Sequence, residues 1–233
     1  MIIKRLLLLS LLLMLTMTMA ETATASSLPY PSHQALFERF NQLNTEQVIR
    51  VTVEHMKDFQ GKLSVFEKVD GVWTVKLSNI PVVLGKSGIG KQKEGDGKTP
   101  LGTYTLGSAF GYGEMPPDIK VDYAPVTEQD YWIDDVNSAD YNTWVNFSGN
   151  ADEAWNSYEK LYTPLYKYAM EINYNVSPII PGKGSGIFLH IWRSPAKPTN
   201  GCIALSEPNL LRVLSQLDPA KSPKIRIGLS RSI

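Results

Sequence analysis

Alternating apolar and polar positions dominate the first half of the chain and predict short β-strands. Five such runs lie between Gln47 and Leu106, QVIRVTVE, KLSVFEKV, VWTVKLS, PVVLG and LGTYTLG, and Asp70-Gly71 between two of them is a hairpin signal. Ahead of them, the segment from His33 to Asn44 has Leu and Phe residues at helical spacing, with Ser32 available as its N-cap. We therefore expect one amphipathic helix followed by a mostly β half.

The second half mixes long loops with a few more elements. Residues 110–150 are rich in Gly, Pro, Asp and aromatic residues without a sustained period, which predicts long loops with a short strand near YWIDD. A helix is expected over Ala151 to Tyr162 and a strand within Tyr166 to Tyr174. The run GSGIFLHIW predicts a strand with Phe188, His190 and Trp192 on one face. SEPNLLRVLSQLD then predicts a helix with Pro208 in its first turn, and KIRIGL a closing strand.

The N-terminus has the pattern of a secretory signal peptide. Lys4 and Arg5 precede an apolar run of about fourteen residues that ends in small residues at Ala20 or Ala25. A membrane-spanning helix needs roughly 20 apolar residues, so we expect cleavage and export, with no stable membrane insertion afterwards.

The net charge and the number of cysteines limit which binding partners and which cysteine chemistry the sequence predicts. Removal of residues 1–20 leaves 21 basic and 23 acidic residues, a net charge of −2. Nucleic-acid binding, which leaves a basic stripe, is therefore not predicted. A single cysteine forms no internal disulfide, and a free thiol in an oxidising compartment either has a use or is well hidden.

Several segments resemble known binding or catalytic motifs but lack residues that those motifs require. GKSGIGKQ imitates a phosphate-binding loop, but Gln92 replaces the magnesium-binding Ser/Thr and no amphipathic helix follows. One cysteine and three scattered histidines give no zinc-site spacing, so no metal is predicted. Asp96, flanked by glycines, is interpreted as a turn residue rather than a working carboxylate.

Cys202 follows His190 by twelve positions, and the two form a candidate nucleophile and base. His190 lies on the predicted strand, and the polar, proline-broken RSPAKPTNG loop is long enough to fold Cys202 back onto that strand. A cysteine attacks as its thiolate and needs a base nearby. Gly201 permits a tight turn whose amide N–H groups can point at a developing oxyanion.

A structural interpretation competes with this one. Cys202 precedes Ile203, Ala204 and Leu205, and free cysteine is among the most buried residue types. The other two histidines, His33 and His55, are expected on the surface.

The segment FLHIWRSPAKPTNGCIALSEPNLLRVL resembles the catalytic motif of the L,D-transpeptidase (YkuD-type) family, in which a strand histidine is followed by a loop ending in Gly-Cys, an apolar run and a helix. Upstream, VVLGKSGIGKQKEGDGKTPLGTYTLGSAFGYG is similar to the hairpin and loop of that family. YWIDDVNSADYNTWV and SYEKLYTPLYKYAMEINYN also resemble segments of one branch. The resemblance spans about Val82 to Leu229.

This resemblance implies a mainly β fold, with β-sandwich-like mixed sheets and a few peripheral helices. It suggests three parts: a signal peptide over residues 1–25, an N-terminal helix and β extension over 26–80, and a catalytic domain over 81–233. It implies an exported enzyme of cell-wall biogenesis and cell shape that acts on peptidoglycan stem peptides without a cofactor. Such enzymes cleave the bond between a diamino acid and D-alanine, hold the acyl group on cysteine and pass it to an amine or to water.

On that resemblance Cys202 is the nucleophile, His190 the general base and later acid, and Gly201 with the Cys202 amide part of the oxyanion hole. Asn200 departs from the commonest family form, which has a second histidine there; its amide can donate a hydrogen bond but cannot act as a base. Weaker candidates for substrate binding are Arg193, Trp192, Lys86 and Tyr158, and Trp132 is a possible cleft wall.

Three functions remain open at this stage. The leading one is an exported L,D-transpeptidase in the periplasm or elsewhere in the cell envelope. The first alternative keeps the chemistry with water as acceptor, giving an L,D-carboxypeptidase or endopeptidase. The second is a catalytically idle wall-binding domain, with Asn200 as a sign of decay.

Overall fold

The computed structural model describes residues 32–233, so the predicted signal peptide lies outside the described residues. These residues form a nine-stranded mixed sheet with strand order β12-β1-β2-β3-β11-β10-β9-β4-β5. Its strands are β1 (Gln47–Val53), β2 (Gln60–Val69), β3 (Val72–Val83), β4 (Gly102–Gly111), β5 (Tyr123–Pro125), β9 (Ala169–Ile172), β10 (Phe188–Ile191), β11 (Ile203–Leu205) and β12 (Lys224–Leu229). The mainly β fold expected from the sequence is confirmed.

The large sheet closes on itself through its last strand. β12 runs parallel to β1 and also pairs antiparallel with β4, from Lys224 opposite Thr105 to Ile227 opposite Gly102. The predicted domain boundary at residues 80–81 falls within β3, and β1 to β3 belong to this same sheet.

β1 is buried on both faces, although Gln47, Arg50 and Thr52 interrupt its apolar residues. Ile49 and Val51 lie in the central core, which the helix α3 (Glu207–Gln216) covers with apolar residues such as Leu210 and Val213. On the opposite face Val48 packs against Phe40 of the helix α1 (His33–Asn41). Ser32 is the N-cap of α1 and accepts a hydrogen bond from the Ala35 N–H, as the sequence predicts.

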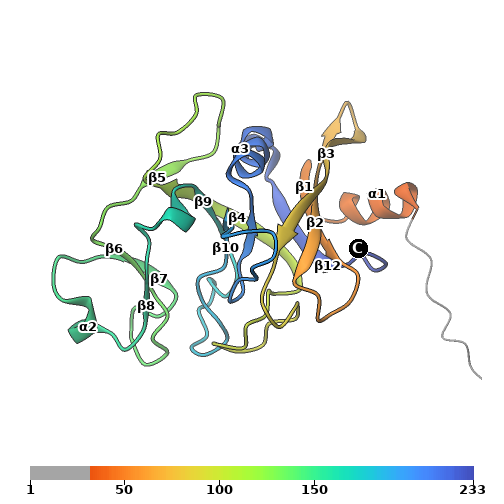
Figure 1. Ribbon diagram of the computed structural model, residues 1–233. Coiled ribbons are helices and arrows are strands. Elements are labelled where there is room, and N and C mark those ends of the chain that lie inside the picture. Colours follow the sequence, from red (N-terminus) through yellow and green to blue (C-terminus); the bar gives the residue numbers. More distant parts are fainter. Residues whose placement is uncertain (1–31) are drawn as a thin grey trace, which may run out of the picture.

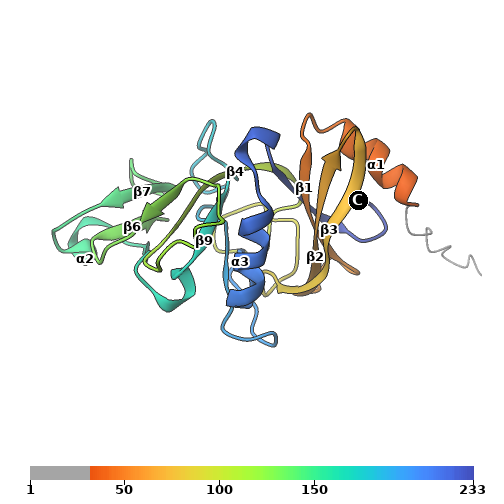
Figure 2. The ribbon, with the colours of Figure 1, turned by 90° about the horizontal axis from the view of Figure 1, so that it is seen from above.

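A second, smaller sheet lies at the end of the molecule away from α1 (Figure 1). It has the order β7-β6-β8, with β6 (Asp130–Ile133), β7 (Thr143–Asn146) and β8 (Tyr158–Lys160). In the view from above, α3 lies between the two ends (Figure 2). No helix within residues 32–233 is long and apolar enough to cross a membrane.

The predicted helix over Ala151 to Tyr162 is wrong. Only α2 (Ala151–Ala154) is helical, and Trp155 at its end has an extended backbone. Trp155 and Tyr158 pack on Tyr131 in an aromatic cluster, and Tyr158 pairs with Ile133 in the small sheet. Tertiary packing therefore overrides local helix propensity here.

Other boundaries differ less from expectation. The region predicted as long loops contains β6 at YWIDD but also β5 and β7. The strand predicted within Tyr166 to Tyr174 is the shorter β9, which follows the 3₁₀ turn η1 (Pro164–Tyr166); a second such turn is η2 (Pro219–Lys221). PVVLG is not a separate strand but the end of β3.

Candidate active site

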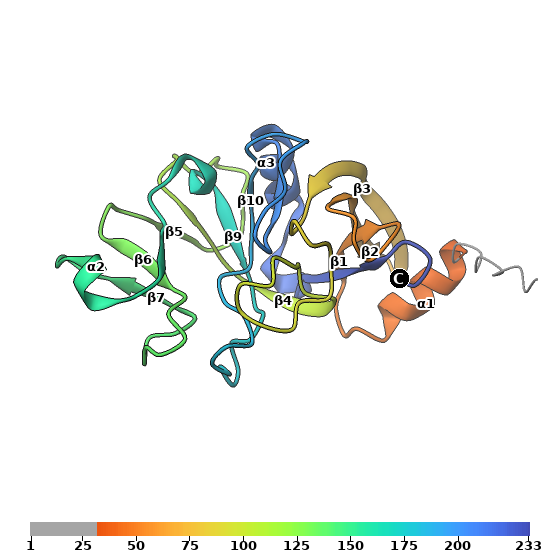
Figure 3. The same cartoon turned by 60° about the horizontal axis from the view of Figure 1, so that its bottom comes forward.

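A cavity of about 720 Å³ contains both Cys202 and His190. The loop between β3 and β4, near the centre of the view in Figure 3, forms one side of it, and β8 with the chain before β9 forms another. The register of the parallel strands β10 and β11 explains the placement, because Leu189 lies opposite Ile203 and His190 opposite Ala204. Cys202 immediately precedes β11 and so lies beside β10.

The Cys202 thiol is buried and hydrogen-bonded to the backbone. Its side chain accepts a hydrogen bond from the Phe188 N–H at 3.4 Å and donates one to the Gly186 carbonyl at 3.2 Å. Burial raises the pKa of the thiol, and the Glu159 carboxylate adds to the rise, while the Phe188 N–H and Lys91 oppose it. The thiol is therefore neutral at pH 7 in this arrangement.

His190 is also buried, and its tautomer follows from one contact. Its Nδ1 lies 2.8 Å from the Ile191 carbonyl oxygen, and because a carbonyl only accepts, Nδ1 carries the proton. Nε2 is then the proton-accepting atom. Burial lowers the pKa of His190 to about 4, the Arg193 charge adds to this, and the Ile191 and Leu165 carbonyls oppose it.

The turn that ends at Cys202 is fixed by hydrogen bonds. Thr199 Oγ1 donates to the Cys202 carbonyl at 2.7 Å and accepts from the Gly201 N–H at 3.1 Å. The Thr199 backbone bonds to Leu84 and Lys86 on the neighbouring loop. Gly201 has φ +157°, and a Cβ there would lie 3.0 Å from the Lys98 carbonyl oxygen. A glycine therefore suits this position better than any larger residue.

The family model for the L,D-transpeptidase catalytic domain (YkuD) matches residues 60–227. The chain belongs to the YkuD family. A crystal structure of an L,D-transpeptidase (Yku) from Stackebrandtia nassauensis is similar at 13% sequence identity with a TM-score of 0.32, covering 78% of this chain and 55% of that one. The chain thus spans about half the length of that protein. A comparison with curated proteins finds no match.

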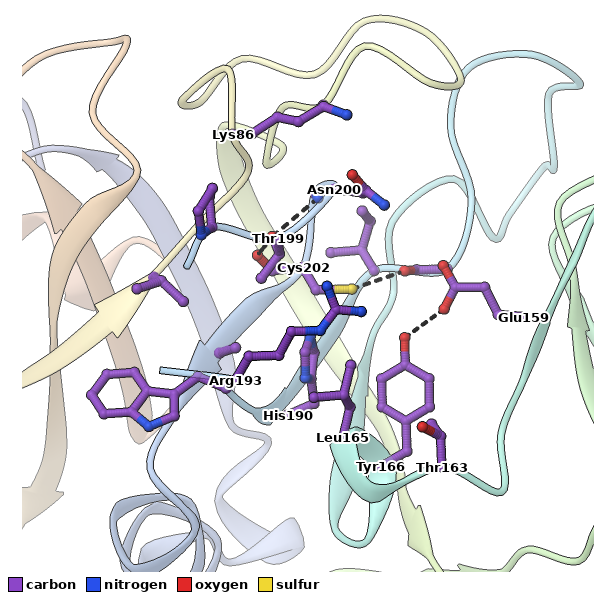
Figure 4. A pocket seen from close by; sticks show the side chains of 18 of the residues that line it. Lys86, Glu159, Thr163, Leu165, Tyr166, His190, Arg193, Thr199, Asn200 and Cys202 are labelled. Atoms are coloured by element: carbon purple, nitrogen blue, oxygen red, sulfur yellow. Dashed lines mark hydrogen bonds between the residues drawn. The ribbon is translucent and has the colours of Figure 1, made fainter. Parts of the chain in front are cut away.

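The oxyanion candidate Asn200 lies in the same cavity as Cys202. Three of the four weaker substrate-binding candidates lie there too, namely Arg193, Trp192 and Lys86. Figure 4 shows the Arg193 side chain reaching toward the space between Cys202 and His190. Asn200 is exposed at the cavity, and Trp192 follows the end of β10 and packs against the central core.

Other residues predicted for the site lie outside the cavity or already form hydrogen bonds within the protein. Tyr158 is not brought to the cavity: its hydroxyl donates to Asp152 Oδ1 at 2.6 Å on the far side of the small sheet. Trp132 is buried against Phe188 and donates to Asn142. The Gly201 N–H, expected in the oxyanion hole, is engaged by Thr199. In the described part of the chain the Cys202 N–H donates to no protein group.

Three carboxylates that the sequence left unassigned or did not single out also line the YkuD cavity: Glu94, Asp134 and Glu159. Glu94 Oε2 accepts hydrogen bonds from Tyr141 and Ser185, each at 2.6 Å. Among residues 32–233, Asp134 Oδ1 is buried and has no hydrogen-bond partner, and burial raises the pKa of this carboxyl. No local pattern marks these residues, because they come together only through the fold.

Lys91 is a further residue that sequence reasoning missed. Its side chain is only 2% exposed and its Nζ lies 3.1 Å from Asp96 Oδ1. Asp96 also accepts from the backbone N–H groups of Gln92 and Lys98, which supports its interpretation as a turn residue. Across residues 32–233 no group of three or more His, Cys, Asp or Glu side chains is arranged to hold a metal ion.

Proposed function

We propose that the protein is an exported peptidoglycan L,D-transpeptidase that carries its acyl intermediate on Cys202. The observation that carries this proposal is that Cys202 and His190 line one cavity, next to a turn fixed by backbone hydrogen bonds. The YkuD family acts on peptidoglycan, which supports stem peptides as the substrate class.

In the first half-reaction Cys202 Sγ attacks the carbonyl carbon of the diamino acid that precedes D-alanine. Since thiol and imidazole are both neutral at rest, the thiol turns from the Gly186 carbonyl and passes its proton to His190 Nε2 as the carbon–sulfur bond forms. His190 then gives that proton to the leaving amine of D-alanine, and the carbon–nitrogen bond breaks.

The negative oxygen that forms during attack needs hydrogen-bond donors. The Cys202 N–H is available for this, and the exposed Asn200 amide at the cavity is a second candidate. This assignment differs from the sequence-based one, because the Gly201 N–H stays with Thr199 and holds the turn.

The second half-reaction transfers the acyl group from Cys202 to an amine. The amine attacks the thioester carbonyl, the carbon–sulfur bond breaks, and His190 carries the proton from the new amide nitrogen to the sulfur. Arg193 and Lys86 line the cavity, and we assign them to carboxylates of the stem peptide.

Incubation of the mature protein with disaccharide tetrapeptides, followed by mass spectrometry of the products, tests this function. Dimeric products with one D-alanine released for each bond formed support transpeptidation. Tripeptide and free D-alanine without dimers would move the assignment to an L,D-carboxypeptidase. No product from a folded protein would favour an idle wall-binding domain.

A further inference from the structure

The carboxylate of Glu159 lies in the cavity, and the steps above give it no role. Glu159 is the middle residue of β8, and its Oε2 accepts a hydrogen bond from the Tyr166 hydroxyl at 2.5 Å. Tyr166 is buried at 6% exposure, so its ring fixes the position of the Glu159 carboxylate.

This pair is in contact with the reacting groups. The Tyr166 and His190 rings meet edge to face, with centroids 5.1 Å apart and an interplanar angle of 89°. The Glu159 charge is close enough to Cys202 to raise the pKa of the thiol. Figure 4 shows Glu159 and Tyr166 beside Cys202, with the Tyr166 hydroxyl directed at the Glu159 carboxylate.

The transfer step needs a base that His190 does not supply. An aliphatic amine has a pKa of about 10, so the acceptor reaches the cavity as an ammonium ion, which has no lone pair for attack. Two protons leave the acceptor nitrogen during transfer, and His190 carries the second of them to the Cys202 sulfur, so the first needs another acceptor.

We propose that Glu159 is the catalytic base that deprotonates the acceptor ammonium, and that Tyr166 is a positioning residue for its carboxylate. One N–H bond of the ammonium breaks, and its proton goes to Glu159 and from there to water. The free amine forms a bond to the thioester carbon, and the carbon–sulfur bond breaks. The second amine proton passes through His190 to Cys202 Sγ. This inference rests on the proposed transpeptidase function.

The Glu159 carboxylate is a negative partner for an ammonium ligand. Two further carboxylates, Glu94 and Asp134, line the same cavity and add to this attraction, while the basic residues of the lining, Lys160 beside Glu159 among them, oppose it. Burial raises the pKa of Glu159, the Tyr166 hydroxyl opposes the rise, and Asp134 and Glu94 add to it. A raised pKa makes Glu159 a stronger base than an exposed glutamate.

The test separates the two half-reactions in Glu159→Gln. Acyl-enzyme formation is followed by intact-protein mass with a tetrapeptide donor, and transfer is followed with two acceptors at pH 7. A primary alkylamine is an ammonium ion at that pH, whereas hydroxylamine is already unprotonated. We expect transfer to the alkylamine to fall about 10²-fold or more, while acylation and transfer to hydroxylamine stay close to wild type.

Asp152→Asn is the matched control. Asp152 also accepts a tyrosine hydroxyl at 2.6 Å, from Tyr158, but it lies outside the cavity. It should behave as wild type with both acceptors. Tyr166→Phe keeps the carboxylate and removes its hydrogen bond, so the pH profile of alkylamine transfer should shift while hydroxylamine transfer does not.

Equal transfer to the alkylamine by wild type and Glu159→Gln would overturn the role of Glu159 while leaving the transpeptidase function intact. An equal loss with both acceptors would also overturn it, because that result indicates a structural defect. Absence of an acyl adduct on the wild type would instead contradict the transpeptidase function itself, and with it this role.

Discussion

Two sides of the cavity hold their residues in different ways. The loop side consists of residues 85–99 and the turn 199–202, and backbone groups make most of its contacts: Thr199 bonds to Leu84 and Lys86, and Thr99 bonds to Gly88. The sheet side consists of Asp134, Glu159 and Tyr166, and side chains make its contacts.

This difference corresponds to two tasks of the site: holding the nucleophile and recognising the acceptor. Backbone hydrogen bonds on the loop side fix the turn that carries the nucleophile, and they tolerate little change because each depends on the path of the chain. On the sheet side the carboxylates of Glu159 and Asp134, rather than the path of the backbone, present the groups that suit acceptor recognition. Changes on the loop side should therefore cost stability and acylation together, whereas a change at Glu159 should mainly affect transfer.

The largest effect is expected at His190, on β10 between the two sides. His190→Gln retains a group that can donate to the Ile191 carbonyl but cannot take the thiol proton. Acylation should fall about 10²- to 10⁴-fold, measured as D-alanine release.

The acylation rate of the wild-type protein should also depend on pH, and it should fall only on the acid side. Because the pKa of His190 is about 4, acylation should be lost only as the pH falls through that value, where the protonated imidazole can no longer accept a proton. Unchanged acylation in His190→Gln would contradict the assignment of this residue as the base.

Lys91→Met should give the largest loss of stability on the loop side. It removes one partner of a buried ion pair and leaves Asp96, whose side chain is 10% exposed, without its cation. The free energy of unfolding should fall by about 3–5 kcal/mol in chemical denaturation. Lys120→Met breaks a pair with Asp218 in which the lysine is 65% exposed, and it should leave the unfolding free energy nearly unchanged.

Thr199→Val should have a smaller effect of the same kind. It removes the donor to the Cys202 carbonyl and the acceptor of the Gly201 N–H, so we expect a loss of about 1–3 kcal/mol and slower acylation. Thr74→Val, which removes an exposed hydrogen bond to the Glu67 carbonyl, is the control. Faster rather than slower acylation would show that the turn does not need the two hydrogen bonds of the Thr199 hydroxyl.

The effect confined to the narrowest range of pH concerns acid stability through Asp96. Burial alone raises its pKa, but hydrogen bonds from the backbone of Gln92 and Lys98 and from Lys91 outweigh this and lower the pKa from 3.8 to about 2. A folded-state pKa below the unfolded value stabilises the protein above pH 3.8, and this contribution is lost as the pH falls toward 2. Unfolding curves of Asp96→Asn should therefore depend less on pH in that window than those of wild type.

Sequence reasoning anticipated the loop side much better than the sheet side. The alternation in QVIRVTVE and KIRIGL is local and predicts β1 and β12 directly. The order of His190, Gly201 and Cys202 likewise lies within thirteen residues, and the structure brings all three to one cavity. Both signals are contained in short, continuous segments.

The sequence did not predict the sheet side, because the spacing of residues 151–162 is interpreted as helical. The sequence predicts a helix over these residues and, separately, Tyr158 as an aromatic substrate contact. In the strand that forms instead, neighbouring residues point to opposite faces, so Tyr158 joins the aromatic cluster while Glu159 reaches the cavity. Trp155 and Tyr131 decide this outcome through packing, which no local pattern reveals.

The most direct test of the central claim is the intact mass of the mature protein after incubation with a tetrapeptide donor, for wild type and Cys202→Ala. We predict an added mass equal to the donor minus D-alanine on the wild type, located on Cys202, and no added mass on the variant. An unmodified wild type that is folded, or an adduct that persists in Cys202→Ala, would contradict the account.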